Sequence, residues 1–175
     1  MSMSYKLADI KVVKTVICAN AAKVNDGDPR LEQDNAFKVV PISNDTIHQL
    51  VAADYAPTTS QIITPLKGGP MGTDALNRMI QAHVNGNSPV VAVYKEREFR
   101  LNDKIIMLKN NYDRGYINGD IGFIRKIGRN ANNELQVTIA FSESRTVDYG
   151  FEDMGHIEHA SATTIHKSQG SEYGV

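Results

Sequence analysis

The sequence predicts an α/β layer that is interrupted by an all-β insert. Residues 13–85 alternate helix-like and strand-like segments, as α/β domains do. Residues 89–151 hold five short strand-like runs, and no helix signal occurs between residues 88 and 150. Short strands at such close spacing are typical of a small barrel. Residues 156–175 then have the composition of a strand end that leads into a polar loop.

The composition fits a globular protein and excludes several other classes. Of the 175 residues, 41% are hydrophobic and 22% are charged, which suits one domain with a small insert. The formal net charge of −1 gives no overall basic field for nucleic acid or an anionic membrane, although a local basic surface remains compatible with it. Cys18 is the only cysteine, so intramolecular disulfides and cysteine zinc sites are excluded and a cytoplasmic setting is expected. No apolar run approaches the roughly 20 residues that span a bilayer.

The first part of the layer is expected to contain two helices and a strand. Apolar side chains recur at helical spacing in residues 13–24, and Asn25-Asp26-Gly27 is a helix stop. A loop then leads to a short strand at residues 37–40. Residues 43–55 carry a second apolar stripe and form the second helix.

A buried strand and a long helix complete the layer. Residues 61–65 form a β-branched run that Pro65 closes. The helix follows a glycine-rich loop, has Thr73 or Asp74 as its cap and ends at Asn85-Gly86. Its apolar stripe is expected to comprise Leu76, Met79, Ile80, His83 and Val84.

The strand-like runs of the insert are separated by turn residues rich in asparagine and glycine. The runs are residues 89–94, 104–110, 120–128, 134–142 and 145–151, and the turns are Asn118-Gly119, Gly128-Arg129-Asn130 and Asn132-Asn133.

The densest polar stretch of the chain is TTIHKSQGSEYGV, residues 163–175. Between Thr164 and Gln169 it offers hydroxyl, imidazole, ammonium and amide groups. Such groups hold the phosphate oxygens of a nucleic-acid backbone or of a nucleotide. The residues alone leave phosphate recognition and an ordinary polar loop equally open.

Two further loops have a functional and a purely structural interpretation. The loop PLKGGPMG, residues 65–72, is a flexible lead into a helix or a phosphate cradle, but it lacks the spacing of a nucleotide-binding phosphate loop. The segment NNYDRGYINGDIG, residues 110–122, is an elaborate hairpin turn or a contact for single-stranded nucleic acid. In the second case Tyr112 or Tyr116 would stack on bases and Arg114 would bind a phosphate.

Three collinear stretches resemble the RecD/TraA-type DNA helicases of superfamily 1, which include the exodeoxyribonuclease V alpha subunit. TTIHKSQGSEY is similar to motif V of that family. NDKIIMLKNNYDRGYINGDIGFI, residues 102–124, resembles the segment that opens its SH3-like barrel, and ITPLKGGPMGTDALNRMIQ, residues 63–81, resembles its motif IV region. VICANAAKVNDG, residues 16–27, resembles a further helix of the family.

The resemblance implies a partial RecA-like second motor domain, of the P-loop NTPase type, with an inserted SH3-like β-barrel. Residues 1–88 would form the first part of the motor domain, residues 89–155 the barrel, and residues 156–175 the return to a motor domain that is truncated after motif V. The sequence departs from the family at three positions. Asn102 and Ser161 replace a glycine and an aromatic residue, and Gly68 stands where relatives carry a second basic residue, so that a phosphate contact there rests on Lys67.

The resemblance also implies site residues. Thr164, His166, Lys167 and Ser168 would contact the phosphates of single-stranded DNA, and Gln169, Gly170, Glu172 and Lys67 would face the nucleotide. The barrel loop would touch DNA through Asn110, Asn111, Tyr112, Arg114 and Asn118. No catalytic residue and no metal ligand is expected in the chain.

The resemblance implies that the chain is a C-terminal fragment of an ATP-dependent DNA helicase of recombination and repair. It would contribute contacts to single-stranded DNA and part of the ATP cleft. ATP and Mg²⁺ would be cofactors of the full-length protein, and this fragment alone would bind neither and hydrolyse no ATP. Its partners would be single-stranded DNA, the first motor domain and subunits of a nuclease complex. No binding to a membrane is expected. The alternative is a stand-alone module that binds nucleic acid or protein and has no motor activity.

Overall fold

The computed structural model divides the chain into two units, residues 1–43 and 44–175, and each is described by itself. It describes residues 55–88 and 90–168, except for the side chains of Val90 and Val91. It also describes residues 23, 26–28, 30, 48, 49, 51 and 52. The expected strand at 37–40, most of the two early helices and residues 169–175 lie outside this part of the chain.

The described residues of the first unit belong to the predicted helix stop. Lys23 is helical, and a turn follows at Asp26 and Gly27, where Gly27 has φ +72°. The amide of Asp28 donates to the Lys23 carbonyl oxygen at 2.8 Å, which closes this turn. Glycine adopts such a positive φ without strain, so the end of the helix agrees with the sequence.

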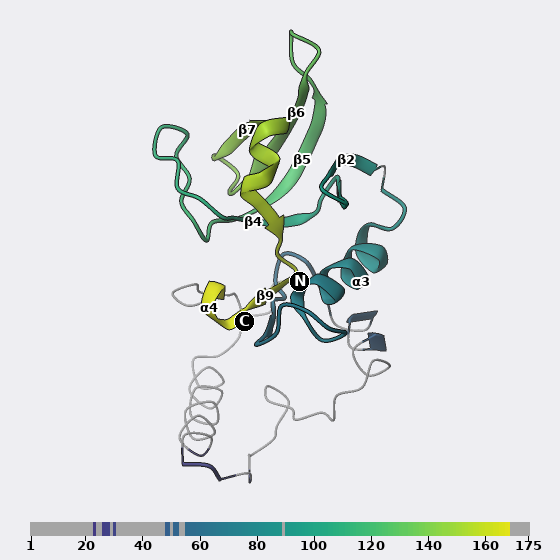
Figure 1. Ribbon diagram of the computed structural model, residues 1–175, viewed down its shortest axis with the longest axis vertical. Helices are drawn as coiled ribbons and strands as arrows, with labels where there is room; N and C mark the ends of the chain where they lie inside the picture. The colour runs from purple at the N-terminus through teal and green to yellow at the C-terminus, as the bar shows by residue number, and fades with distance from the viewer. Residues whose placement is uncertain are drawn as a thin grey trace, which may run out of the picture. The chain divides into compact units, whose positions relative to one another are not determined.

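The second unit contains a small α/β layer, drawn in the lower part of the coloured ribbon in Figure 1. Strand β1 (Ile62–Thr64) pairs in parallel with strand β9 (Ala162–Thr164), a hundred residues later. Helix α3 (Thr73–Asn85) covers them and buries Leu76 and Ile80 against Val51 and Ala162. The predicted strand and helix are therefore both confirmed.

Helix α3 differs from its prediction at both ends. Its N-cap is Gly72, and no side chain caps it. His83 and Val84 are exposed, so the apolar stripe ends at Ile80. The reason is that the later turns contact the protein through polar side chains at four-residue spacing, Asn77, Gln81 and Asn85. Apolar spacing cannot reveal such a face.

The insert is built on a five-stranded antiparallel sheet in the order β7-β6-β5-β4-β8 (Figure 1). A separate hairpin joins β2 to β3, and the 3₁₀ helix η1 packs against β6 and β7. The elements are β2 (Val90–Tyr94), β3 (Arg97–Arg100), β4 (Lys104–Met107), β5 (Ile121–Arg129), β6 (Leu135–Ala140), β7 (Thr146–Gly150), η1 (Phe151–His156) and β8 (Ile157–His159).

A single apolar core fills this sheet domain. It combines residues from every strand and from η1, as expected for a sheet that curls around its own interior. Its members are Ala92, Phe99, Ile105, Met107, Tyr116, Ile124, Val137, Ile139, Tyr149, Met154 and Ile157.

All five predicted strands are present, but two more were not predicted. Strand β3 follows a turn at Lys95 and Glu96, which have φ values of 47° and 66°. Turns of this kind usually carry glycine or asparagine, so this one gives no sequence signal. Strand β8 pairs with β4, which extends the sheet to His159 and places the return to the layer at residues 160–161.

One predicted turn is wrong. Gly128 and Arg129 continue β5, and the chain reverses only at residues 130–133. The side chain of Asn130 accepts hydrogen bonds from the amides of Asn132 and Glu134, which fixes the turn at this later position. The predicted turns at Asn118-Gly119 and Asn132-Asn133 are confirmed, with φ +96° at Gly119 and +64° at Asn133. None of the described helices is long and apolar enough to cross a membrane.

Candidate nucleic-acid interface

The polar stretch begins within β9, whose last residue is the half-buried Thr164, and continues into the short helix α4 (Ile165–Ser168). Thr164 pairs with Thr64 at the end of the parallel ladder. His166 and Lys167 are exposed, whereas the Ser168 hydroxyl donates to the Ile165 carbonyl oxygen at 2.9 Å. Two of the four predicted phosphate contacts therefore face solvent, and Ser168 bonds its own helix. Gln169, Gly170 and Glu172 lie outside the described residues.

Three cations from distant parts of the chain meet at Glu158 in β8. Lys167 Nζ donates to Glu158 Oε2 at 2.6 Å, and Arg97 donates from one terminal nitrogen to Oε1 at 3.3 Å. Lys67 Nζ lies 3.9 Å from Oε1. Burial raises the pKa of Glu158, but the hydrogen bond and charge of Lys167, with the charges of Arg97 and Lys67, outweigh it and lower the pKa. Glu158 therefore stays ionised.

These side chains border a groove of about 610 Å³. Helix α3 and the β2–β3 hairpin line it, together with residues of β8, β9 and α4, including Thr164. Positive side chains outnumber negative ones in its lining, although the chain as a whole has a net charge of −1. The lining cations are Lys67, Arg78, Lys95, Arg97 and Lys167, and the carboxylates are Asp74, Glu96, Glu98 and Glu158.

The glycine-rich loop before α3 is a compact turn. The amides of Thr73 and Asp74 donate to the carbonyl oxygens of Leu66 and Lys67, at 3.0 and 3.2 Å. A Cβ atom at Gly72 would collide with the carbonyl oxygens of Lys67 and Gly68. The first amides of the helix are thus bonded within the loop, so the loop offers a phosphate the Lys67 side chain.

The loop between β4 and β5 mostly stabilises itself. Asn110 Oδ1 accepts from the amide of Asn118 at 2.7 Å, and Asn111 Oδ1 accepts from the amide of Arg114 at 3.0 Å. The Arg114 guanidinium bonds Asp153 at 2.7 Å, and this hydrogen bond raises the pKa of Arg114.

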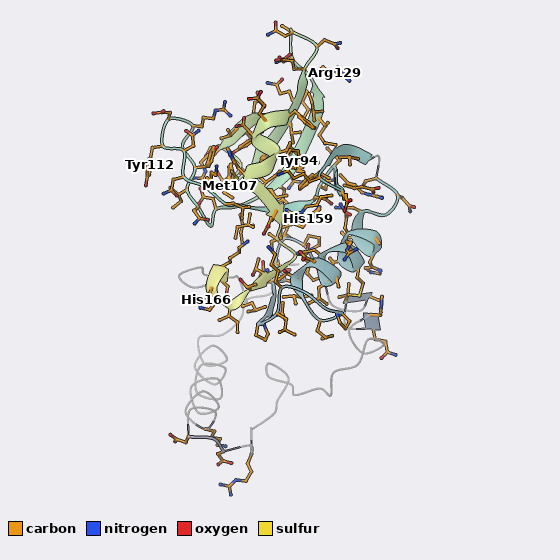
Figure 2. All side chains as sticks on the ribbon, viewed as in Figure 1. Tyr94, Met107, Tyr112, Arg129, His159 and His166 are labelled. Atoms are coloured by element: carbon orange, nitrogen blue, oxygen red, sulfur yellow. The ribbon has the colours of Figure 1, made fainter. Side chains whose placement is uncertain are left out.

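The two tyrosines of this loop differ in exposure. Tyr116 is 2% exposed and packs against Tyr149 in the core, so it cannot stack on a base. Tyr112 is 77% exposed and is labelled at the outer part of the loop in Figure 2. Of the loop residues considered, Tyr112 is the one whose ring is open to a base, and the loop does not line the groove.

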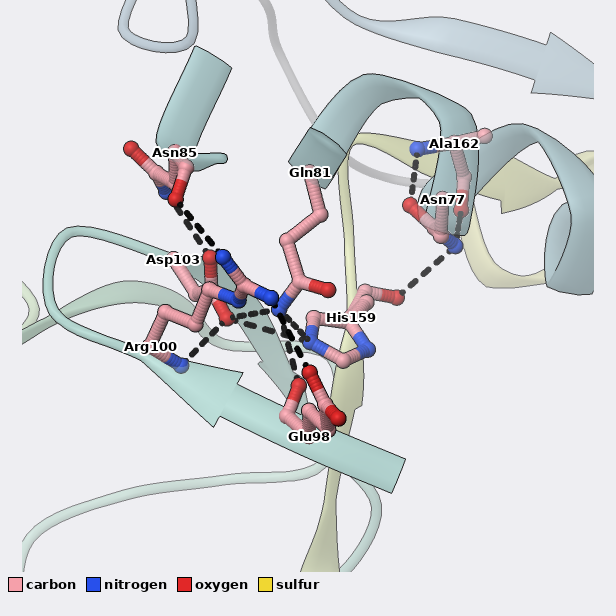
Figure 3. Close-up of polar contacts among 8 residues, drawn as sticks. All are labelled: Asn77, Gln81, Asn85, Glu98, Arg100, Asp103, His159 and Ala162. Carbon is pink, nitrogen blue, oxygen red and sulfur yellow. Dashed lines mark hydrogen bonds and ion pairs between the residues drawn. The ribbon is translucent and has the colours of Figure 1, made fainter. Parts of the chain in front are cut away.

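A polar cluster around the buried Asp103, which sequence reasoning missed, joins α3 to the sheet domain (Figure 3). We call Gln81, Asn85, Arg100, Asp103 and His159 the Asp103 cluster. The Asp103 carboxylate, 2% exposed, accepts from Gln81 Nε2 at 2.6 Å, Asn85 Nδ2 at 2.8 Å and the Arg100 amide at 2.7 Å. These bonds tie the last turns of α3 to the start of β4.

His159 contributes a fourth bond to this carboxylate. Its Nε2 lies 3.2 Å from both Asp103 Oδ2 and Gln81 Nε2. The two amide hydrogens of Gln81 are already directed to Asp103 and to the Glu98 carbonyl oxygen. We therefore assign the proton to His159 Nε2, which donates to Asp103, while the ring stacks on Phe99 at 4.8 Å.

Asn77 holds the connection that leads to Thr164. Its Nδ2 donates to the Ala162 carbonyl oxygen at 2.9 Å, and its Oδ1 accepts from the Ala162 amide at 2.8 Å (Figure 3). Nearby in the layer, Lys104 Nζ donates at 3.0 Å to the carbonyl oxygen of Ser60, which precedes β1, and burial lowers the pKa of Lys104. The sequence signal existed, because Asn77, Asp103 and Lys104 all fall within the stretches that resemble the helicases.

Comparison with known proteins identifies the sheet domain. Residues 76–141 match the family model described as the ATP-dependent RecD-like DNA helicase SH3 domain. The ATP-dependent RecD2 DNA helicase of Deinococcus radiodurans is 30% identical over 119 residues, which cover 68% of this chain and 16% of that protein. The chain thus spans a small part of its relative's length.

Two solved structures show a related fold. The crystal structure of the Pif1 helicase from Bacteroides in complex with ADP-AlF3 and ssDNA has a TM-score of 0.51 and is 13% identical, covering 90% of this chain and 41% of that one. A structure of two coordinating Pif1 helicases on forked dsDNA has a TM-score of 0.50, 14% identity and coverages of 90% and 39%. The resemblance seen in the sequence is confirmed: residues 76–141 of this chain are similar to the SH3 domain of ATP-dependent RecD-like DNA helicases.

Proposed function

We propose that the chain is part of the second motor domain of a RecD-like superfamily 1 helicase, which unwinds DNA at the expense of ATP in recombination and repair. The family of residues 76–141 supports this proposal, as does the parallel pairing of β1 and β9 beneath α3. In this proposal residues 1–88 and 160–175 belong to a RecA-like layer. Residues 89–159 form its inserted SH3-like barrel, because β8 pairs with β4 of the barrel sheet.

The proposed role of the chain is to hold phosphates of single-stranded DNA. One observation carries it: Lys67, Arg97 and Lys167 reach one groove from three separate elements. Cationic side chains that converge in this way are suited to a phosphate backbone. His166 is exposed beside Lys167 on α4, and Tyr112 offers its ring to a base. Thr164 lines the groove. The loop between β4 and β5, which carries Tyr112, is then held in shape by Asn110, Asn111, Arg114 and Asn118.

The proposed contribution to the ATP cleft rests on the resemblance. The resemblance assigns Lys67 to the nucleotide as well, but its approach to Glu158 together with Arg97 and Lys167 favours a DNA phosphate. Gln169, Gly170 and Glu172 then carry the proposed contribution to the ATP cleft. Among the described residues there is no group of three or more His, Cys, Asp or Glu that could hold a metal ion. The resemblance assigns the Mg²⁺ ligands to the first motor domain, which is the proposed partner within the protein. In an exodeoxyribonuclease V-like assembly, nuclease subunits would be further partners.

Binding of single-stranded DNA tests the proposal. Residues 1–175 should bind a fluorescent oligothymidine of about 20 nucleotides weakly and in a salt-sensitive way, because phosphate contacts dominate such affinity. The double variant His166→Ala/Lys167→Ala should bind more weakly, and its slope of log K against log salt should shrink by about 0.7, because the Lys167 charge is lost.

Lys126→Ala is the matched control, because Lys126 is exposed on β5 and does not line the groove. It should bind as the parent does. Binding that is equal in the parent and the double variant would remove His166 and Lys167 from the interface.

ATP hydrolysis separates the motor from a simple binding module. Residues 1–175 contain no phosphate loop, and they lack the acidic Mg²⁺-binding motif and the arginine motif that the resemblance requires for hydrolysis. We expect no DNA-stimulated ATPase activity from them in a coupled phosphate-release assay. Turnover above the blank would overturn the assignment to the second motor domain. A phosphate loop in the same reading frame ahead of residue 1 would favour the motor over the module.

A further inference from the structure

The cations around Glu158 carry more positive charge than its single carboxylate can neutralise. Lys67 precedes α3, Arg97 begins β3 and Lys167 lies in α4, yet all three approach one carboxylate within 4 Å. Three positive charges surround this one carboxylate, a local excess of two, and the groove lining as a whole has five cations and four carboxylates. Like charges repel, and a fold gathers them at one point only when something offsets the cost.

These cations are also open to solvent. The side chains of Lys67, Arg97 and Lys167 are 65%, 43% and 39% exposed, whereas Glu158 is 20% exposed. Exposed ion pairs of this kind add little to stability, typically about 0–1 kcal/mol. The arrangement is therefore poorly explained as a structural support, and its cationic ends are accessible to a ligand.

The three contacts leave hydrogen-bond donors unused. Lys167 forms a short bond to Oε2, but Arg97 directs one N–H group to Oε1, and the Lys67 ammonium at 3.9 Å is too far away to donate to it. A guanidinium has five N–H donors and an ammonium has three. Arg97 and Lys67 can therefore bind a second anion without breaking the bond between Lys167 and Glu158.

We propose that Lys67, Arg97 and Lys167 form a subsite for one phosphate of a DNA strand, and that Glu158 is its internal counter-ion. This inference rests on the proposed binding of single-stranded DNA. Without DNA, Glu158 holds the cations together. When a strand binds, Lys67 and Arg97 turn to the phosphate, and the Glu158 charge beside it weakens the grip. A weak grip suits a protein that must release each phosphate to move along the strand.

The isosteric variant Glu158→Gln tests the inference, because it removes the charge and keeps the shape. Measured by anisotropy with fluorescent oligothymidine at low salt, its affinity should exceed that of the parent by roughly three- to tenfold. The slope of log K against log salt should steepen by as much as about 0.7, the amount expected for one additional phosphate contact on a single strand.

Arg97→Gln adds a second readout. It should weaken binding more in the Glu158→Gln background than in the parent, because the guanidinium is then free of its internal partner. Lys126→Gln, on the exposed face of β5, is the charge-matched control and should leave both affinities unchanged. Thermal melts confirm that each variant is folded.

The outcomes separate this inference from the proposed function. If neither the parent nor Glu158→Gln binds the oligonucleotide, both fail. If the parent binds and depends on Lys167, but Glu158→Gln binds equally or more weakly, the proposed function stands and the counter-ion role is overturned. An equal gain for DNA in Glu143→Gln, which removes an exposed carboxylate outside the groove, would also overturn it. A fluorescent ATP analogue measured without DNA is the last arm: a gain for it alone would assign the subsite to a nucleotide and reject the DNA phosphate.

Discussion

The Asp103 cluster and the groove around Glu158 are both polar, and adjacent residues of β8 lead to them, but they differ in how their charges are satisfied. Asp103 is buried and accepts four bonds from groups that surround it. Glu158 is surrounded by more positive charge than it can neutralise, and that charge reaches solvent. Polar groups that satisfy one another internally maintain the fold, whereas an exposed excess of charge is available to a ligand. Substitutions in the two regions should therefore have opposite signatures.

The largest effect is expected from Asp103→Ala. This change leaves the half-buried donors of Gln81, Asn85 and the Arg100 amide without their acceptor, which costs about 2–4 kcal/mol of unfolding free energy. Urea denaturation of residues 1–175 measures the loss. A loss below about 1 kcal/mol would show that water replaces the carboxylate and that the cluster is not a structural joint.

Asn77→Leu should have the next largest effect. It removes both bonds to Ala162 and buries that residue's amide and carbonyl without partners, at a cost of about 2 kcal/mol. His83→Ala, on an exposed position of the same helix, should stay within about 0.5 kcal/mol of the parent in the same denaturation series. Similar losses in both variants would mean that α3 is sensitive to any change.

The groove should show the reverse pattern. Lys67→Ala and Arg97→Ala remove exposed charges, so each should change the unfolding free energy by less than about 1 kcal/mol. Each should also reduce the salt slope of oligothymidine binding by about 0.7, because one phosphate contact is lost. A variant that melts early and binds DNA normally would contradict the distinction between the two regions.

The smallest effect concerns pH. The pKa of Glu158 is lowered from its ordinary value of 4.5, so its ion pairs stabilise the folded state above that value. This contribution is lost as the pH falls through the lowered pKa of the folded state. The melting temperature of the parent, relative to that of Glu158→Gln, should stay constant from pH 7 to 5 and fall only at more acidic pH. A relative decline that begins near neutral pH would place the titrating group elsewhere.

The sequence predicted the elements that have a strong local signal. Helix α3 follows from apolar spacing, β1 from a β-branched run that a proline closes, and β2 and β4 to β7 from strand-like runs between turns. The motif resemblance identified the family before any contact was known. Strand β3 escaped prediction because three of its four residues are charged and its turn lacks glycine and asparagine.

The sequence predicted individual residues of the site, but not which of them lie close together. Lys67 was assigned to the nucleotide and Lys167 to DNA, yet both approach Glu158, which sequence reasoning did not single out. Glu158 lies 91 positions after Lys67, and its partners come together only through the pairing of β8 with β4 and of β9 with β1. Local patterns cannot reveal a meeting point that depends on such long-range pairing. The roles proposed for Thr164, His166 and the nucleotide residues remain predictions.

Gly72 has no charge and no hydrogen-bonding side chain, yet the charge pattern of the groove depends on it. Any side chain there would collide with the carbonyl oxygens of Lys67 and Gly68 and force that backbone outward. A relative with a larger residue at position 72 could keep every lysine and arginine of the groove and still have the Lys67 ammonium in a different place. A substitution at position 72 would therefore weaken phosphate binding by Lys67 without changing the charge of the groove. We expect position 72 to tolerate fewer substitutions than the positions of the cations.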